Sequence, residues 1–251
     1  MNRPDLVLAL HGTRSAAGQQ VGAAIAAAVA ARLPGVQVHL GWADVLSPTL
    51  TQTLSGLGGA VVVPGFLTAG YHVTSDLPAA IEASGGRARL AGLIGPGLIA
   101  AVADRLHAAE ASAPGGPADA VVLAAAGSKR RRSVLEVAGA ARELAVLLDR
   151  PVVAGFITAA EPSVADAVAR LRASGHRRIA VASYLLAPGE FANRLHTVAA
   201  DVVSEPIGVH PLVVAAVVEA YAAAATEQLD LPDAPAAQFA GAAGLGRELI
   251  A

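Results

Sequence analysis

Short runs of aliphatic residues alternate along the chain with longer segments rich in alanine. The runs Asp5–Leu10 and Val61–Val63 are apolar at successive positions, which is typical of strands buried on both faces of a parallel sheet. The segment Gly18–Leu33 has the length of a helix and stops at Pro34-Gly35. Because strands and helices alternate, the pattern predicts an α/β fold with helices on both faces of a parallel sheet.

Turn and cap residues refine this prediction in the first half of the chain. Ser47 and Pro48 are expected to open a short helix, with serine as cap and proline at the first position. Pro64 and Gly65 are expected to end the strand that precedes His72, and Ser75 to begin the helix after it. The other strands and helices of this half are expected over Val36–Trp42, Ala79–Ser84, Arg89–Leu93 and Gly97–Ala109.

The pattern starts again after Glu110–Asp119, a linker of small residues rich in proline and glycine. Gly12 recurs as Gly127, 115 residues later, and Gly70 recurs as Gly189, 119 residues later. Landmarks at nearly one spacing and in the same order predict an internal duplication. The units expected are an N-terminal repeat, a degenerate C-terminal repeat and a loosely ordered tail, over residues 1–112, 118–228 and 229–251.

Two histidines distinguish the repeats. His11 and His72 each follow a predicted strand, at the carboxyl end where open α/β sheets bind their ligands. The second repeat has Ala126 and Phe191 at these places. A role tied to the fold would tend to appear in both copies, so the asymmetry favours a functional pair. Two imidazoles can ligate a divalent metal or accept protons near neutral pH, yet they fall short of the four ligands of a closed structural zinc site.

A dense basic cluster, Lys129–Arg132, follows the first strand of the second repeat. Each cation in the first turn of a helix interacts unfavourably with the helix dipole, at a cost of about 0.3–1 kcal/mol. A cluster of four at this position therefore indicates either a function or strong solvation. If the repeats face each other, the cluster lies opposite the histidines and suits a polycarboxylate. A solvated basic face is the alternative.

Composition narrows the class of protein. Hydrophobic residues make up 54% of the chain, but no run approaches the roughly 18 or more apolar residues of a membrane span, and the first apolar run stops at His11-Gly12, too early for a signal peptide. Cysteine is absent and the net charge is −2, which disfavour disulfides and general nucleic-acid binding. The glycine-rich phosphate motifs are missing. We expect a cytoplasmic monomer or homodimer that uses no nucleotide and binds neither membrane nor nucleic acid.

The segments LVLALHGTR (6–14) and VVPGFLTAGYHVTSDLP (62–78) resemble the sirohydrochlorin chelatases, the two-repeat class II (ATP-independent) tetrapyrrole chelatases. The resemblance continues through the second repeat. It implies two Rossmann-like domains with a cleft between them, in which Fe²⁺ or Co²⁺ is inserted into sirohydrochlorin. The family's paired histidines map onto His11 and His72, as catalytic residues and as metal ligands. Without histidine at Ala126 and Phe191, the chain departs from the most symmetric members and is expected to hold one active site.

The same resemblance suggests which residues hold the substrate. Arg14, Lys129 and Arg130 are candidates for the carboxylates of the macrocycle, because charge-assisted pairing suits such groups. Phe66 and Tyr71 are candidates for apolar contact with the ring, although both could be core residues.

The sequence leaves open the choice of metal and two rival functions. Iron, which gives siroheme, is favoured over cobalt, which gives cobalt-sirohydrochlorin for cobalamin, although imidazole accepts both. A metal or tetrapyrrole carrier would use the histidines without turnover. A two-lobed binding protein for another anion would use the arginines instead. Asp44 and Glu161 are weak candidates for assisting the metal, and the remaining histidines are expected to be structural or on the surface.

Overall fold

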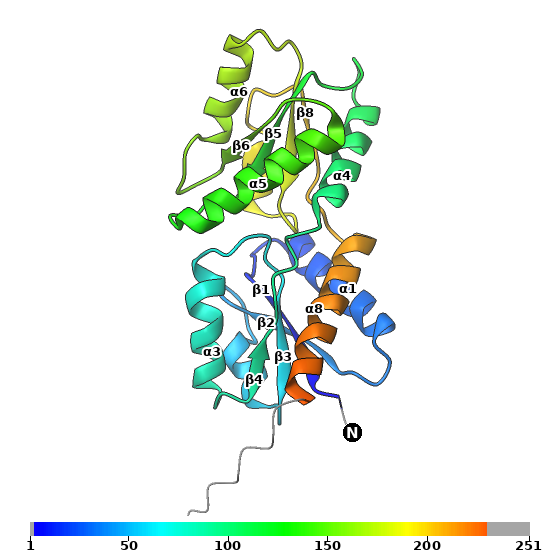
Figure 1. The fold of residues 1–251 in the computed structure, drawn as a ribbon, viewed down its shortest axis with the longest axis vertical. Coiled ribbons are helices and arrows are strands. Elements are labelled where there is room, and N and C mark those ends of the chain that lie inside the picture. The colour runs from blue at the N-terminus through cyan, green and yellow to red at the C-terminus, as the bar shows by residue number, and fades with distance from the viewer. Residues whose placement is uncertain (1–2, 230–251) are drawn as a thin grey trace, which may run out of the picture.

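The computed structural model describes residues 3–229 and contains two four-stranded parallel sheets, one in each half of the chain (Figure 1). The first sheet has the order β2-β1-β3-β4, built from β1 (Asp5–Leu10), β2 (Val38–Trp42), β3 (Ala60–Pro64) and β4 (Ala88–Leu90). The second has the order β6-β5-β7-β8, built from β5 (Ala120–Ala125), β6 (Val152–Phe156), β7 (Ile179–Tyr184) and β8 (Val202–Val203). The identical strand orders confirm two similar α/β units.

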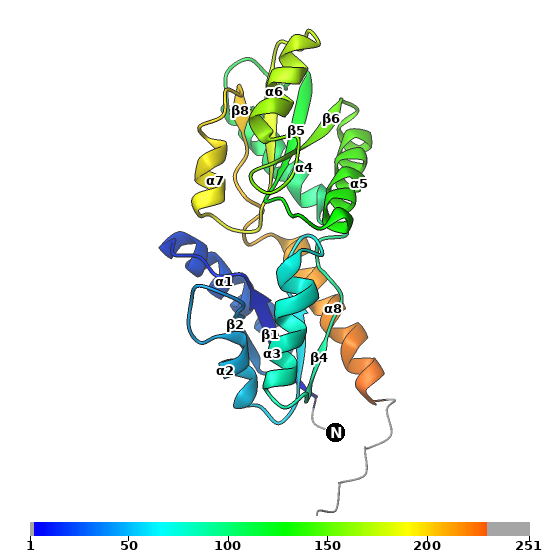
Figure 2. The same cartoon turned by 90° about the vertical axis from the view of Figure 1, so that its left-hand side faces the viewer.

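Helices flank both sheets (Figure 2). The first half contains α1 (Ala16–Arg32), α2 (Leu50–Ser55), a π-helical turn η1 (His72–Asp76), α3 (Leu77–Ala83) and α4 (Ile99–Ser112). The second contains α5 (Arg131–Leu148), α6 (Val164–Ala173), α7 (Glu190–Leu195) and α8 (Pro211–Leu229). None of the helices in the described part of the chain is both long and apolar enough to span a bilayer.

Side chains of β1 alternate between two apolar cores, as the pleat of a strand requires. Leu6 and Leu8 point into the larger core, whereas Val7 and Ala9 point into a smaller one that α2 and α3 cover. All four are fully buried. The continuous apolar run seen in the sequence is therefore explained by helices on both faces of the sheet.

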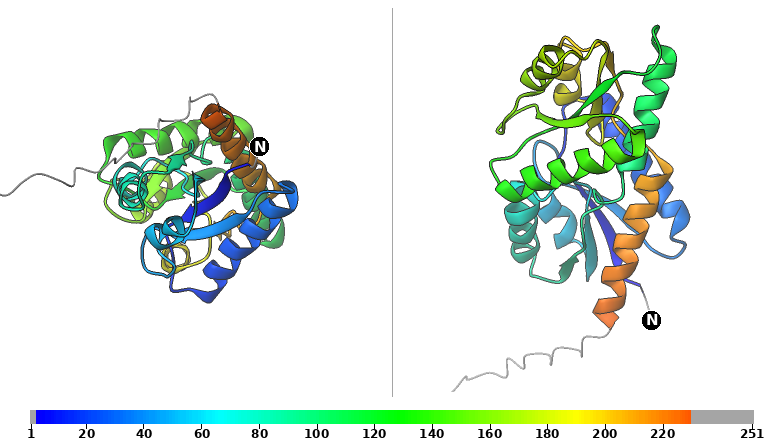
Figure 3. Two further views of the ribbon diagram at one scale, coloured as in Figure 1. Left: turned by 90° about the horizontal axis from the view of Figure 1, so that it is seen from below. Right: turned by 45° about the horizontal axis from the view of Figure 1, so that its top comes forward.

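The last helix of each repeat packs on the sheet of the other repeat (Figures 1 and 3). Helix α4 contacts β7, β8 and α5 of the second half, and α8 contacts α1, β3 and β4 of the first. The repeats over 1–112 and 118–228 are therefore not the units that pack together, because each exchanges its final helix. The larger apolar core consequently runs through both halves. The expected tail over 229–251 lies outside the described residues, apart from Leu229.

Several boundaries differ from those expected. The end of β3 is as expected, because Pro64 is the last residue of the strand, in register with Ala9, and Gly65 lies outside it. Thr49, not Ser47, caps α2, and its side chain forms a capping box with Gln52. Helix α4 continues through Ser112, so the linker begins later than Glu110. The propensities of single residues missed the start of α2 and the end of α4, which backbone hydrogen bonds decide.

His72 does not hang from a loop, as the sequence suggested. It begins the π-helical turn η1, and Ser75 lies inside that turn and is not a helix cap. Helix α3 follows directly from Leu77. π-Helical turns are rare and frequently occur at functional sites.

The strand order places both histidines at one point of the first sheet. The chain passes from β1 to β2 on one side and then to β3 on the other, so the crossover direction reverses between β1 and β3. A crevice opens at such a switch point, at the carboxyl ends of the strands. His11 directly follows β1, and His72 lies beyond the end of β3.

Candidate active site

A cavity of about 1500 Å³ lies between the carboxyl ends of the two sheets. It exceeds the roughly 300–1,000 Å³ of ordinary small-molecule pockets, so it has room for a large ligand. Both halves of the chain line it. Every residue proposed from the sequence as catalytic or substrate-binding is on its wall: His11, Arg14, Phe66, Tyr71, His72, Lys129 and Arg130.

His11 is placed by a tight turn at the end of β1. Gly12 has a φ of 98°, and a Cβ there would lie 2.2 Å from the carbonyl oxygen of Asp44, so this turn needs glycine. Gly127 repeats the arrangement after β5, with a φ of 95° and a Cβ position 1.8 Å from the carbonyl oxygen of Thr158. The two repeats therefore share the turn, and only the first carries the imidazole.

His72 is held by its neighbours on several sides. Its Nδ1 lies 2.6 Å from Oδ2 of Asp76, four residues later on the same turn. The ring of Phe66 stacks on it at a centroid distance of 6.1 Å, and the ring of Tyr71 meets it edge-on at 6.3 Å. The side chain of His72 keeps 32% of its surface exposed, which leaves an edge of the ring accessible from the cavity.

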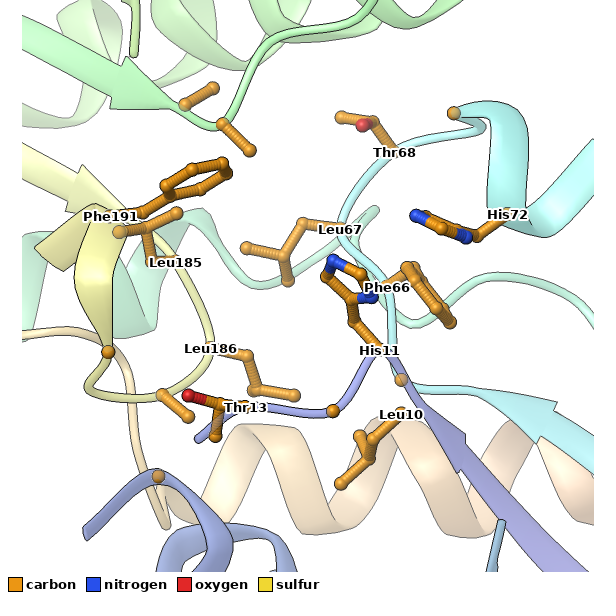
Figure 4. A pocket seen from close by; sticks show the side chains of 18 of the residues that line it. Leu10, His11, Thr13, Phe66, Leu67, Thr68, His72, Leu185, Leu186 and Phe191 are labelled. Atoms are coloured by element: carbon orange, nitrogen blue, oxygen red, sulfur yellow. The ribbon is translucent and has the colours of Figure 1, made fainter. Parts of the chain in front are cut away.

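The two histidine rings lie side by side on the cavity wall (Figure 4). Their centroids are 4.4 Å apart and their planes are inclined by 35°. Partial burial lowers the pKa of His11 below its ordinary value, and the nearby His72 lowers it further. A backbone hydrogen bond and the Asp44 and Asp76 carboxylates raise the pKa, but by less. His11 is consequently held towards the neutral form, which is the form that binds metals and accepts protons.

The facing wall is apolar. Figure 4 shows Leu185, Leu186 and Phe191 of the second half across the pocket from the histidines. Tyr184 of the second half also lines the cavity, and its hydroxyl donates a hydrogen bond of 3.3 Å to the carbonyl of Leu67 in the first half. Burial raises the pKa of Tyr184, so the hydroxyl stays protonated. Such a surface suits the face of a planar, largely apolar ring.

The basic cluster Lys129–Arg132 lies exposed at the start of α5 and lines the cavity. Arg130 reaches across to the first half, where its Nη2 donates a hydrogen bond of 3.0 Å to Ser75 Oγ and its guanidinium lies 5.5 Å from the centre of the Tyr71 ring. Arg132 pairs with Glu136 at 2.9 Å. Arg130 therefore connects the second half to the turn that carries His72.

Sequence reasoning missed several contacts around the site. The interaction of Asp76 with His72 had a local signal, since residues four apart share one face of a helix. The interaction of Glu136 with the backbone N–H of Ala69, at 2.7 Å, joins segments 67 residues apart. No local pattern predicts such a contact, because only the packing of the two halves creates it.

The weak metal candidates are engaged with backbone groups. Asp44 Oδ1 accepts a hydrogen bond of 2.7 Å from the N–H of Val45, and Glu161 Oε2 accepts one of 3.1 Å from the N–H of Ser163. Within residues 3–229, no three or more His, Cys, Asp or Glu side chains gather in a way that could hold a metal ion.

Three histidines form carboxylate pairs away from the cavity lining, in agreement with the structural role expected for them. These pairs are His39–Asp5 at 3.1 Å, His176–Asp119 at 3.5 Å and His210–Asp104 at 3.3 Å.

Known proteins share this sequence pattern and fold. A sirohydrochlorin cobaltochelatase of Methanococcoides burtonii is 32% identical over 73 residues, which are 27% of this chain and 56% of that protein, so the match spans about half of the relative's length. The structure of SirB from Bacillus subtilis with Fe³⁺ has a TM-score of 0.75 at 22% identity, over 90% of this chain and 97% of that one. The structure of CbiX, the terminal enzyme for biosynthesis of siroheme in denitrifying bacteria, has a TM-score of 0.63 at 26% identity, over 88% and 99%.

The family model of CbiX matches this chain twice, over residues 5–109 and 120–224. The two matched segments coincide with the two repeats and together cover most of the chain. The chain therefore belongs to the CbiX family, which confirms the resemblance to the sirohydrochlorin chelatases seen in the segments around His11 and His72.

Proposed function

We propose that this protein is a metal chelatase that inserts a divalent metal into sirohydrochlorin, in the cavity between its two halves. The observation that carries the proposal is the pair of imidazoles, 4.4 Å apart, on the wall of a cavity of about 1500 Å³. Insertion removes two protons from pyrrole nitrogens and strips water from the metal. Neutral imidazoles can perform either task, because they are bases near neutral pH and ligands of divalent metals.

His11 and His72 would bind the incoming ion together. Two imidazoles fill only part of its coordination sphere, so water and then pyrrole nitrogens take the remaining positions. The lowered pKa of His11 keeps that ring neutral and free to bind the ion. A site of this kind takes a metal and releases it to a stronger chelator, as an insertion reaction requires.

The rest of the cavity suits the tetrapyrrole. The wall formed by Leu185, Leu186 and Phe191 offers apolar contact to one face of the macrocycle, and Phe66 and Tyr71 offer it near the histidines. Arginine and lysine side chains at the rim suit the peripheral carboxylates. Arg14, Lys129 and Arg130 are the residues we assign to this task.

We propose Fe²⁺ as the physiological metal, with Co²⁺ as the second candidate. The relatives differ on this point: one is named a cobaltochelatase, and others are a SirB with Fe³⁺ and an enzyme of siroheme biosynthesis. We further propose a cytoplasmic protein, monomeric or homodimeric, that needs no nucleotide and acts on a small molecule, without nucleic-acid or membrane partners.

A steady-state insertion assay with purified protein, sirohydrochlorin and Fe²⁺ or Co²⁺ tests the proposal. His11→Ala and His72→Ala should each abolish insertion and leave the melting temperature nearly unchanged, because cavity side chains contribute little packing. His196→Ala is the matched control, since His196 is exposed at the end of α7 and should retain full activity.

The outcomes separate the proposal from its rivals. Full activity in either cavity mutant would overturn the assignment, and a large fall in melting temperature would indicate a structural role instead. Tight metal or tetrapyrrole binding without turnover in the wild type would identify a carrier. A binding protein for another anion would keep its affinity in His72→Ala.

A further inference from the structure

Asp76 occupies the residue before helix α3 but does not cap it. Aspartate at such a position commonly accepts a hydrogen bond from a backbone N–H of the first helical turn. Here the side chain makes no cap hydrogen bond, and Oδ2 lies 2.6 Å from Nδ1 of His72. The carboxylate therefore serves the imidazole and not the helix.

This contact selects one tautomer of His72. An ionised carboxylate can only accept hydrogen bonds, so Nδ1 must carry the hydrogen and donate it to Asp76. In the neutral ring, the lone pair then lies on Nε2. The ring points towards the pocket beside His11 (Figure 4), so the lone pair is available to a ligand there. The free side chain of histidine favours the hydrogen on Nε2, so the contact with the carboxylate opposes that preference.

The second repeat indicates that the fold does not require an acid at this position. The strand registers relate Ala60 to Ile179, a spacing of 119 residues, which places Phe191 at the position of His72 and Leu195 at that of Asp76. Leu195 is 1% exposed and packs in the apolar core of its half. The degenerate copy thus has neither the imidazole nor the carboxylate, as expected if the two act as a unit.

We propose that Asp76 is a positioning residue, which holds His72 in the Nδ1–H tautomer so that Nε2 meets the metal or the pyrrole proton. The stacked ring of Phe66 and the π-helical turn fix the plane of the imidazole, and Asp76 fixes which ring nitrogen carries the hydrogen. Carboxylates that orient metal-binding histidines in this way typically change affinity or activity 10–100-fold when removed. This inference rests on the proposed function of the cavity.

The test compares the wild type with Asp76→Asn and Asp76→Ala. Long-range ¹⁵N–¹H NMR of the metal-free protein, at a pH where His72 is neutral, reads the tautomer directly. We expect Nδ1–H in the wild type and a shift towards Nε2–H in Asp76→Ala, whereas the amide oxygen of Asp76→Asn can still accept the Nδ1 hydrogen and should retain part of the wild-type tautomer. In the insertion assay Asp76→Ala should lose about 10–100-fold in kcat with KM nearly unchanged and should bind Co²⁺ alone more weakly, with Asp76→Asn between it and the wild type.

Asp5→Asn is the matched control, because Asp5 pairs with His39 at 3.1 Å outside the cavity. It should change neither the His72 tautomer nor kcat. An unchanged tautomer in Asp76→Ala, or kcat within twofold of the wild type in that variant, would overturn the inference. The NMR result does not depend on turnover, so a wild type that fails to insert metal would reject the proposed function while the tautomer test still decides the role of Asp76.

Discussion

At the scale of single residues, His11 and His72 share a cavity wall but have different surroundings. His72 has a carboxylate partner in Asp76 and stacks against Phe66, whereas partial desolvation and the neighbouring imidazole lower the pKa of His11. The pair therefore combines an oriented ring with a ring held towards its neutral form.

The pKa of His11, followed by NMR titration of the metal-free protein, should lie below the ordinary value of about 6.5. It should rise in His72→Ala, because the variant removes a neighbouring positive charge and admits water. A lowered pKa means that His11 stays neutral as the pH falls through the range in which free histidine becomes charged. A value at or above 6.5 in the wild type would contradict the electrostatic account of the site.

At the scale of elements, the junction of α4, the linker and α5 depends on one buried ion pair. Arg150 makes two hydrogen bonds to Glu110, of 2.7 and 3.1 Å, and the N–H of Ala118 donates a third of 2.9 Å. The side chains of Glu110 and Arg150 are only 4% and 16% exposed. Burial opposes ionisation of Glu110, but these partners outweigh it and lower its pKa.

Glu110→Gln should lower the free energy of unfolding by about 3–5 kcal/mol at pH 7, because it leaves Arg150 buried without its counter-ion. The pKa of Glu110 is lower in the folded protein, so its contribution is present above the unfolded value of about 4.5 and is lost as the pH falls through the folded value. Urea denaturation at pH 7 and at pH 3 should therefore show the difference between variant and wild type shrinking in acid.

Glu190→Gln is the matched control for this ion pair, since Glu190 pairs with Arg194 on the surface. Exposed pairs contribute about 0–1 kcal/mol. A loss below about 1 kcal/mol for Glu110→Gln as well would show that the junction does not depend on its charge.

The start of α5 is the second element with a testable role. Lys129 and Arg131 are exposed at the cavity, whereas Arg130 is engaged with Ser75 and Tyr71 of the first half. Neutralising Lys129 and Arg131 together therefore tests substrate binding without disturbing the turn at His72. Two exposed charge pairs predict an increase in KM of about 2- to 30-fold with kcat nearly unchanged.

Salt supplies a further readout for the basic cluster. Raising the ionic strength should weaken substrate binding more in the wild type than in the double variant, because exposed charges are screened over about 8–10 Å. Arg142→Gln with Arg170→Gln is a charge-matched control, since neither residue lines the cavity. Equal KM values and salt dependence in all three proteins would show that the cluster is only a solvated face, and Arg14 would be the next candidate.

At the scale of the whole molecule, two equivalent halves enclose one cavity. The exchange of α4 and α8 gives them a common core, and Arg130 and Tyr184 connect them across the pocket. The close approach of Gly18 in α1 to Pro188 is a further contact, since a Cβ on Gly18 would lie 2.3 Å from the carbonyl oxygen of Pro188. The second half thus forms the other wall of the cavity that His11 and His72 line.

Ala126→His combined with Phe191→His restores the histidine pattern of the first repeat but should not create a second working site. Both positions line the same cavity as His11 and His72, so one macrocycle occupies the space of both pairs. Leu195 also stands where the first repeat has Asp76. Single-turnover assays should yield one metallated tetrapyrrole per chain in the variant, as in the wild type, and a second equivalent would contradict the shared cavity.

The sequence by itself determined the α/β class, the duplication and the two histidines at strand ends. These features depend on local apolar runs, on glycines needed for φ near 95–98° and on the contrast between His11 and Ala126, all of which can be read along the chain. The boundaries at Ser47 and Ser75 were wrong because each depends on which backbone groups find a partner in the fold.

Only the tertiary structure decided which parts of the chain meet. The exchange of α4 and α8 leaves no mark in the sequence, because both helices bury apolar faces against a parallel sheet and either sheet offers the same surface. The contact of Arg130 with Ser75 joins residues 55 positions apart, and the 4.4 Å approach of His11 to His72 joins residues 61 apart. Such distances result from the packing of strands and halves, because local propensity acts over only a few residues.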